Sequence, residues 1–254
     1  MIRVIIIGSG NVAKHLYIAL HDQKSVAVIQ CYNRKGILLH PNQKKDTVTK
    51  ELDTLKDADI YILAVSDNAI KEVSNSLPIN NKLIVHTSGS VPMNILKGTN
   101  KKGVFYPLQT FSKNKIVDFK AIPICIEAES PNDSELLKKL ALTLSKKVYE
   151  ISSEQRNVLH VSAVFVNNFT NHLFSIANDI CTDHQIPFEI LHPLILETAQ
   201  KATTISPDIA QTGPAIREDS TTIQRHLKTI KNNTQKDIYQ TLTRAIQNKH
   251  GKKL

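Results

Sequence analysis

Residues 2–13 read IRVIIIGSGNVA, an almost unbroken apolar run followed by a turn that contains two glycines. Such a run is typical of a parallel strand that helices cover on both faces. Beyond Gly8, Gly10 and Ala13, apolar residues recur at helical spacing as far as residue 20. A strand that leads through a glycine-rich turn into a helix predicts the opening unit of a doubly wound α/β sheet.

Short apolar runs continue this alternation through the first half of the chain. Strands are expected at residues 26–31, 60–65 and 83–85, further strands at 104–105, 122–126 and 147–151, and a helix at 134–144. Alternating strands and helices favour a single layered sheet with helices on its faces.

The pattern changes near residue 152. From there on only helical periodicity is found, over residues 154–180, 187–203, 219–231 and 234–248. The sequence therefore predicts two domains, an α/β Rossmann domain over 1–152 and an all-α substrate domain over 153–254.

The glycine turn has the features that a diphosphate requires. Gly8 permits a tight turn from strand to helix, and Gly10 has no side chain to keep phosphate away from the backbone. The N–H groups at the start of the following helix attract anions. We therefore expect a dinucleotide to bind at Gly8, Ser9, Gly10, Asn11 and Val12, although a purely structural turn has the same pattern.

The end of the second expected strand indicates which dinucleotide binds. A carboxylate there would bind the ribose 2′-hydroxyl of NAD, but this chain has Asn33, Arg34 and Lys35. Asn33 does not repel a 2′-phosphate, and the two cations can neutralise it, Arg34 by a bidentate contact. NADP is therefore favoured over NAD. The alternative is that Arg34 and Lys35 are ordinary surface charges.

Two more strand ends carry polar residues. Val65 and Ser66 follow one strand and are expected beside the adenosine ribose, whereas Thr87 and Ser88 follow the next and are expected nearer the nicotinamide. His86 precedes them, and the sequence leaves open whether it is a structural histidine or touches the substrate.

Candidates for chemistry lie in the helix that begins near residue 154. His160, Asn168 and Asn171 fall on one broad face at 100° per residue. Reduction of a carbonyl or imine needs a proton donor, and a histidine, with an ordinary pKa of about 6.5, suits that role. The alternative is that these residues cap or cross-link packed helices.

A second polar cluster, residues 211–219, contains a Gly-Pro turn that fixes its neighbours. Arg217 in this cluster is a candidate clamp for a substrate carboxylate. Asp219 caps the following helix or orients Arg217, and a plain salt bridge between the two is the alternative.

Composition narrows the class of protein. The chain has 254 residues, 41% of them hydrophobic, and no apolar run long enough to cross a bilayer. Its net charge of +9 comes from short, separated groups without interleaved aromatic residues, which argues against nucleic-acid binding. Three scattered cysteines indicate a reducing cytoplasm, and the spacing of the histidines predicts no metal site.

The chain resembles a family of Rossmann-like proteins whose C-terminal half is domain-of-unknown-function family 2520. The resemblance rests on six stretches that extend over almost the whole chain: IIGSGNVA, AVSD, HTSGS, GVFYPLQTFS, HVSAVFVNNFTNHL and QTGPAIREDS. It implies an NADP-type Rossmann domain followed by a helical domain like that of 6-phosphogluconate dehydrogenase and pyrroline-5-carboxylate reductase, which commonly dimerises. Ketopantoate reductases have a lysine, with an asparagine one turn on, where this chain has His160 and Val164.

Together these features predict an NADP-dependent oxidoreductase that reduces a small carboxylate-bearing carbonyl or imine, with ketopantoate as the first candidate. Catalysis is assigned to His160, Asn168, Asn171 and Arg217. The expected partners are a small-molecule substrate and a second copy of the chain, and neither nucleic acid nor a membrane. The alternative is a non-catalytic protein that senses NADP(H) through the same pocket.

Overall fold

The computed structural model describes residues 1–113 and 115–250. The chain forms two compact units, Met1–Asn167 and Asn168–Leu254. The predicted division at residues 152/153 coincides with the change from strand to helix. The first unit nevertheless extends past it to include helix α4 (Ser153–Ala163), because the first turns of this helix are bonded to the sheet. The domains 1–152 and 153–254 stay a prediction.

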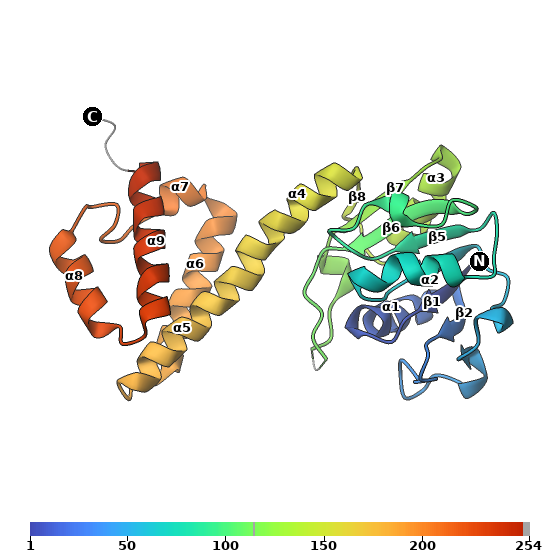
Figure 1. Ribbon diagram of the computed structural model, residues 1–254, viewed down its shortest axis with the longest axis horizontal. Coiled ribbons are helices and arrows are strands. Elements are labelled where there is room, and N and C mark those ends of the chain that lie inside the picture. Colours follow the sequence, from blue (N-terminus) through green and yellow to red (C-terminus); the bar gives the residue numbers. More distant parts are fainter. Residues whose placement is uncertain (114, 251–254) are drawn as a thin grey trace. The chain divides into compact units, whose positions relative to one another are not determined.

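The first unit is built on an eight-stranded sheet (Figure 1). Its strands are β1 (Ile2–Ile7), β2 (Val26–Tyr32), β3 (Val48–Thr49), β4 (Ile60–Leu63), β5 (Leu83–His86), β6 (Lys101–Pro107), β7 (Ile124–Ala128) and β8 (Val148–Glu150). Their order is β3-β2-β1-β4-β5-β6-β7-β8, and all neighbours are parallel except β6 and β7. The carboxyl ends of β1 and β4 form the topological switch point, where such sheets bind ligands.

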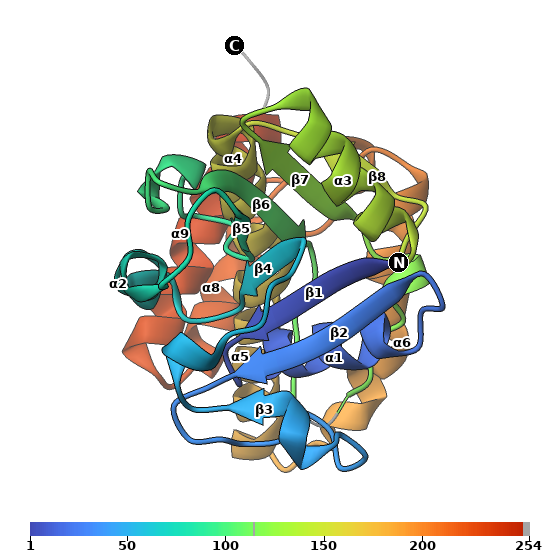
Figure 2. The same ribbon diagram turned by 90° about the vertical axis from the view of Figure 1, so that its right-hand side faces the viewer.

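Helices cover both faces of this sheet, which explains the unbroken apolar run of β1. Val4 and Ile6 belong to an apolar core with residues of α1 and α3, whereas Ile5 and Ile7 belong to a second core with residues of α2. These helices are α1 (Asn11–His21), α2 (Ile70–Ser76) and α3 (Pro131–Leu142). Figure 2 shows α1 and α3 on one side of the sheet and α2 on the other.

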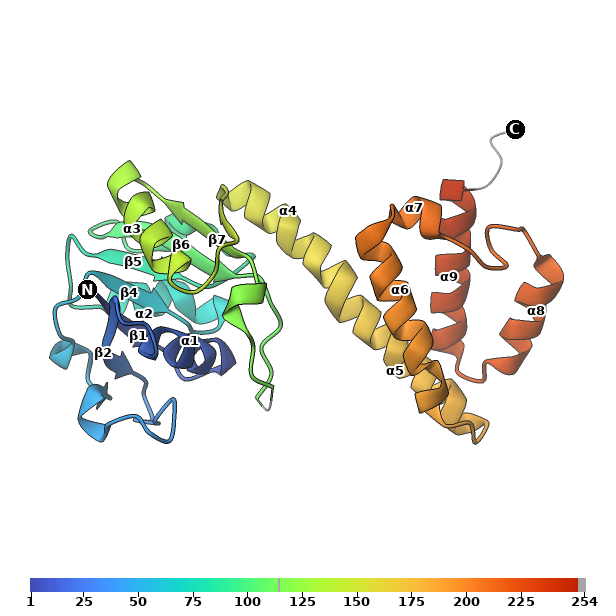
Figure 3. The same ribbon diagram turned by 180° about the vertical axis from the view of Figure 1, so that it is seen from behind.

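The second unit is helical throughout its described residues (Figure 3). Its helices are α5 (Thr170–Asp183), α6 (His192–Thr204), α7 (Pro207–Ala210), α8 (Ser220–Thr229) and α9 (Asn233–His250), with a 3-10 helix at Phe188–Leu191. Between α4 and α5 the residues Val164–Phe169 form a π-helix. In the ranges 1–113 and 115–250, no helix combines the length and the hydropathy that a bilayer span requires.

The predicted fold class, an α/β Rossmann domain followed by an all-α region, is confirmed. Strand β3 and helices α2 and α7 were not expected from the sequence. They have two, seven and four residues, which is too short for a periodic hydrophobic pattern to develop.

Candidate cofactor and active site

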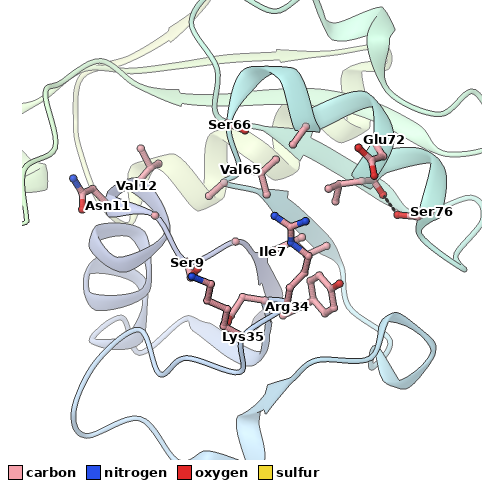
Figure 4. A pocket seen from close by; sticks show the side chains of 17 residues that line it. Ile7, Ser9, Asn11, Val12, Arg34, Lys35, Val65, Ser66, Glu72 and Ser76 are labelled. Atoms are coloured by element: carbon pink, nitrogen blue, oxygen red, sulfur yellow. Dashed lines mark hydrogen bonds between the residues drawn. The ribbon is translucent and has the colours of Figure 1, made fainter.

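A cavity of about 520 Å³ opens at the switch point between the carboxyl ends of β1 and β4. Ten of the twelve residues predicted to bind the cofactor line it: Gly8, Ser9, Gly10, Asn11, Val12, Asn33, Arg34, Lys35, Val65 and Ser66. Figure 4 shows the labelled ones among them around this cavity, together with Glu72 and Ser76 of α2. The structure therefore brings together segments that lie up to about seventy residues apart in the sequence.

Gly8 makes the close approach of β1 to β4 possible. Its φ is +131°, a backbone conformation that L side chains rarely adopt, and a Cβ at this position would collide with the carbonyl oxygen of Ala64. Its N–H donates to the carbonyl of Tyr32 at 2.8 Å, so the turn is also tied to β2. Gly8 therefore shapes the turn.

Gly10 has a different role, because it leaves space. It is the N-cap of α1, with φ −72° and ψ −177°, and no side chain in the described part of the protein caps the helix. A Cβ built there meets no atom of the described residues within 4 Å. The N–H groups of the first helical turn have no carbonyl within their own helix to bond. The open, electropositive end of α1 thus fits the diphosphate of a dinucleotide.

Arg34 and Lys35 lie in a short loop that Asn33 closes. The Asn33 amide donates to the carbonyl of Ile37 at 2.9 Å and accepts from the N–H of the same residue at 2.8 Å, and the Asn33 side chain is buried. Both cationic side chains are exposed and point into the cavity in Figure 4. Asn33 therefore contributes by holding the loop, and the two cations are available for a 2′-phosphate.

Thr87 and Ser88 are buried after β5 and do not line this cavity. The hydroxyl of Ser88 accepts from the N–H groups of Ser90 and Val91 at 3.2 and 3.1 Å. Ser90 in turn donates to Asp67 at 2.6 Å. The hydroxyl of Ser88 thus organises the loop, and contact of Thr87 and Ser88 with a cofactor stays a prediction.

His86 is fully buried at the end of β5. Its Nδ1 accepts from the backbone N–H of Ser88 at 3.2 Å. Burial, and to a smaller extent the nearby Arg156 cation, lower the pKa of His86 from its ordinary value to about 4. Of the two interpretations that the sequence left open, this environment favours the structural one.

The stability of the protein should fall in mild acid because of His86. In the unfolded chain this ring takes up a proton near pH 6.5, whereas in the folded protein it does so only near pH 4. Stability is therefore complete above about pH 6.5 and is lost as the pH falls toward 4, by about 2 kcal/mol at pH 5. Urea unfolding at pH 7.5 and pH 5 measures this loss. His86→Asn should lose correspondingly less over the same interval, and an equal loss would contradict the assignment to His86.

His160 meets Tyr106 at the carboxyl edge of the sheet. The hydroxyl of Tyr106, on β6, lies 3.3 Å from Nδ1 of His160, on α4, and the two rings are nearly edge to face. Gly89 lies directly against both. A Cβ on Gly89 would be 2.5 Å from Nδ1 of His160 and 2.8 Å from the Tyr106 hydroxyl. The histidine that the sequence proposed as a proton donor is thus held at the edge where β5 and β6 end.

A buried ion pair fixes the helix that carries His160. Arg156 is fully buried and bonds through Nη1 to the carboxylate of Glu127 on β7. Its Nη2 donates to the carbonyl of Val91 at 2.6 Å. The same carboxylate accepts from the N–H and the hydroxyl of Ser153 at about 3.0 Å. The start of α4 is therefore bonded to both β7 and the loop after β5.

Three predicted catalytic residues, Asn168, Asn171 and Arg217, belong to the second unit, where each is exposed. The alignment of Asn168 and Asn171 with His160 at 100° per residue does not hold through the π-helix Val164–Phe169, which has more residues per turn. Asp219 caps α8 by accepting from the N–H and hydroxyl of Thr222 at 2.9 and 2.7 Å. The roles of Asn168, Asn171 and Arg217 stay predictions.

Two family models and several solved structures match this chain. Residues 3–89 match the model "NADP oxidoreductase coenzyme F420-dependent", and residues 122–246 match domain of unknown function DUF2520. The crystal structure of BF3122 from Bacteroides fragilis, a candidate NADP oxidoreductase, is 38% identical over 97% of this chain and 98% of its own, with a TM-score of 0.84. The chain belongs to this family of NADP oxidoreductases with a DUF2520 domain.

More distant solved structures share the fold of this DUF2520 oxidoreductase. TM1727 from Thermotoga maritima covers 96% of the chain and 97% of its own length at 21% identity, with a TM-score of 0.74. An imine reductase from Myxococcus stipitatus, solved with NADP⁺, covers 98% and 96% at 15% identity, with a TM-score of 0.62. No curated protein is significantly similar in sequence. The predicted oxidoreductase class and the predicted cofactor, NADP, are those of the family.

Four residues that surround or fix His160 in this NADP oxidoreductase were not predicted from the sequence: Gly89, Tyr106, Glu127 and Arg156. Gly89 and Tyr106 lie in the stretches HTSGS and GVFYPLQTFS, which mark the family without revealing a contact with His160. Arg156 stands one helical turn before His160, and that spacing is the one available signal for it. Nothing in the sequence near Glu127 distinguishes it from a surface carboxylate.

Proposed function

We propose that this protein reduces a small carboxylate-bearing carbonyl or imine with NADPH, and that a 2-oxo acid such as ketopantoate is the first substrate to test. One observation carries the proposal. The edge of the sheet that presents the open N-terminus of α1 and the cations Arg34 and Lys35 also carries His160, held by Tyr106. A cofactor site and a proton donor on one sheet edge support a reductase.

Each candidate residue is assigned one role in binding the cofactor or the substrate. Arg34 and Lys35 bind the 2′-phosphate, and the first turn of α1 binds the diphosphate. His160 gives a proton to the substrate, Asn168 and Asn171 orient it, and Arg217 holds its carboxylate. When bound, NADPH supplies a hydride from C4 of its dihydronicotinamide ring. In this proposal the Rossmann domain 1–152 holds the cofactor, and the helical domain 153–254 carries the residues that act on the substrate.

Arg34→Ala should weaken NADPH binding about 10-fold to 100-fold and leave NADH binding nearly unchanged. The guanidinium contacts only the 2′-phosphate in this proposal, and a charge-assisted contact contributes roughly 1.5–3 kcal/mol. Calorimetric titration of both nucleotides measures the two affinities. Arg244→Ala, which removes an exposed arginine of α9 outside the cavity, serves as the control. Equal losses of NADPH and NADH binding would show that Arg34 does not bind the 2′-phosphate.

The reaction is tested by NADPH oxidation with a panel of small substrates: ketopantoate, other 2-oxo acids, pyrroline-5-carboxylate and coenzyme F420. The last belongs in the panel because the matching family model names it. Turnover with a carboxylate substrate, lost in Arg217→Met mainly through a higher KM, supports the proposal. Tight NADPH binding without turnover on any member would favour the sensing protein instead.

We further propose that the protein is a cytoplasmic homodimer. Ile190, Leu194 and Leu196 of the second unit each leave more than 60% of their surface exposed. Large apolar side chains exposed at several positions of the helical unit are the observation that supports a surface covered by a second copy. Sedimentation equilibrium at micromolar concentration tests the dimer.

A further inference from the structure

Tyr106 and His160 form a pair that chain order does not suggest. They are 54 residues apart, on β6 and α4, and the hydroxyl oxygen of Tyr106 is 3.3 Å from Nδ1 of His160. The pair closes over Gly89, where no side chain larger than hydrogen fits between the rings without displacing one of them. Three separate segments, β6, α4 and the loop after β5, thus converge on one ring nitrogen.

The hydroxyl of Tyr106 can keep a hydrogen bond to Nδ1 of His160 in both charge states of the imidazole. Burial raises the pKa of Tyr106 to about 12, so the phenol keeps its proton at neutral pH. A protonated hydroxyl both donates and accepts hydrogen bonds. It donates to Nδ1 when the imidazole is neutral with its proton on Nε2, and it accepts from Nδ1–H when the ring is an imidazolium. The contact survives the change of charge on His160.

We propose that Tyr106 is a positioning residue that fixes the ring of His160 through Nδ1 and leaves Nε2 as the nitrogen that faces the substrate. This inference rests on the proposed reductase function. Gly89 contributes to this arrangement because its lack of a side chain lets Tyr106 and His160 come into contact. The pair Arg156–Glu127 fixes the backbone one helical turn earlier, so that both the base and the tip of the His160 side chain are held.

Hydride addition to the carbonyl carbon moves the π electron pair onto the oxygen, which then needs one proton. His160, as the imidazolium, gives the proton on Nε2 to this oxygen and becomes a neutral imidazole with its remaining proton on Nδ1. That proton is donated to the hydroxyl oxygen of Tyr106. A proton from water then restores the imidazolium, and Tyr106 ends the cycle unchanged.

Tyr106→Phe removes the hydroxyl and keeps the ring that fills the space. We expect kcat to fall about 10-fold, as for the loss of one hydrogen bond, with the KM for NADPH unchanged. In ¹⁵N-labelled protein, compared with the wild type in the same alkaline buffer, the Nδ1 resonance of His160 should move toward that of a nitrogen without a hydrogen bond. Tyr149→Phe, on the exposed part of β8, is the matched control and should alter neither quantity.

Gly89→Ala provides a second, independent variant. Its added methyl group should separate the two rings and change kcat and the Nδ1 resonance in the same direction as Tyr106→Phe. An unchanged Nδ1 resonance in Tyr106→Phe, or an unchanged kcat, would overturn the proposal. If the wild-type protein reduces no member of the panel, the proposed function fails, while the NMR comparison still tests whether Tyr106 holds His160.

Discussion

Gly10→Asp is expected to weaken NADPH binding strongly while leaving the folded protein as stable as before or slightly more so. Gly10 is the N-cap of α1 in the extended conformation that aspartate readily adopts, and its side-chain position is open space. Aspartate is among the best N-cap residues, because its carboxylate accepts from the N–H groups of the first turn. The change therefore supplies the cap that the helix lacks.

The same carboxylate would occupy the diphosphate position with the wrong charge. Like charges in contact cost several kcal/mol, so the affinity for NADPH should fall by about 100-fold or more. The affinity for NADH should fall equally, because both nucleotides carry the diphosphate. Opposite effects on stability and on binding distinguish this site from a structural turn, where the substitution would change stability alone.

Calorimetry and urea unfolding on one preparation measure both effects. Gly98→Asp is a matched control, because Gly98 is exposed, lies outside the cavity and has no described atom within 4 Å of a built Cβ. It should change neither binding nor stability appreciably. Retention of NADPH affinity in Gly10→Asp would show that the N-terminus of α1 does not hold the diphosphate.

The features that were predicted correctly from the sequence are those that neighbouring residues determine. The run of β1, the turn at Gly8 and Gly10 and the start of α1 lie within twenty residues, and each follows from burial or backbone geometry. The cations Arg34 and Lys35 were predicted from their place at the end of the second strand, and they line the cavity. The sequence predicted Asn33 as a neutral neighbour of a phosphate. It did not reveal that the Asn33 amide also closes the loop, since a hydrogen bond to Ile37 leaves no trace in the pattern.

The rest of the site depends on pairings between distant segments. Tyr106 meets His160 only because β6 lies beside β5 and α4 returns to the same edge. Arg156 meets Glu127 only because β7 reverses direction next to β6. His160, Asn168 and Asn171 were predicted to share a helix face because an α-helix rotates 100° per residue. The π-helix Val164–Phe169, which lies between His160 and Asn171, does not have this rotation. Hydrophobic periodicity contains none of this information.

Glu127→Gln should destabilise the protein by about 3–5 kcal/mol, because it leaves the Arg156 cation without a counterion inside the protein. The Arg156 side chain is 1% exposed and the Glu127 side chain 15%. Arg156→Met should cost less, since the remaining carboxylate keeps the N–H and hydroxyl of Ser153 as donors and some access to water. The expected order of the two losses therefore follows from burial.

The double variant Glu127→Gln, Arg156→Met separates the ion pair from the packing around it. It should be less destabilised than Glu127→Gln alone, because no unpaired charge remains in the interior. Glu129→Gln is the control, since its partner Lys102, at 3.0 Å, forms an ion pair whose carboxylate side chain is 45% exposed. That variant should lose at most about 1 kcal/mol. Equal losses in Glu127→Gln and Glu129→Gln, measured by urea unfolding at neutral pH, would show that the buried pair does not hold α4 to the sheet.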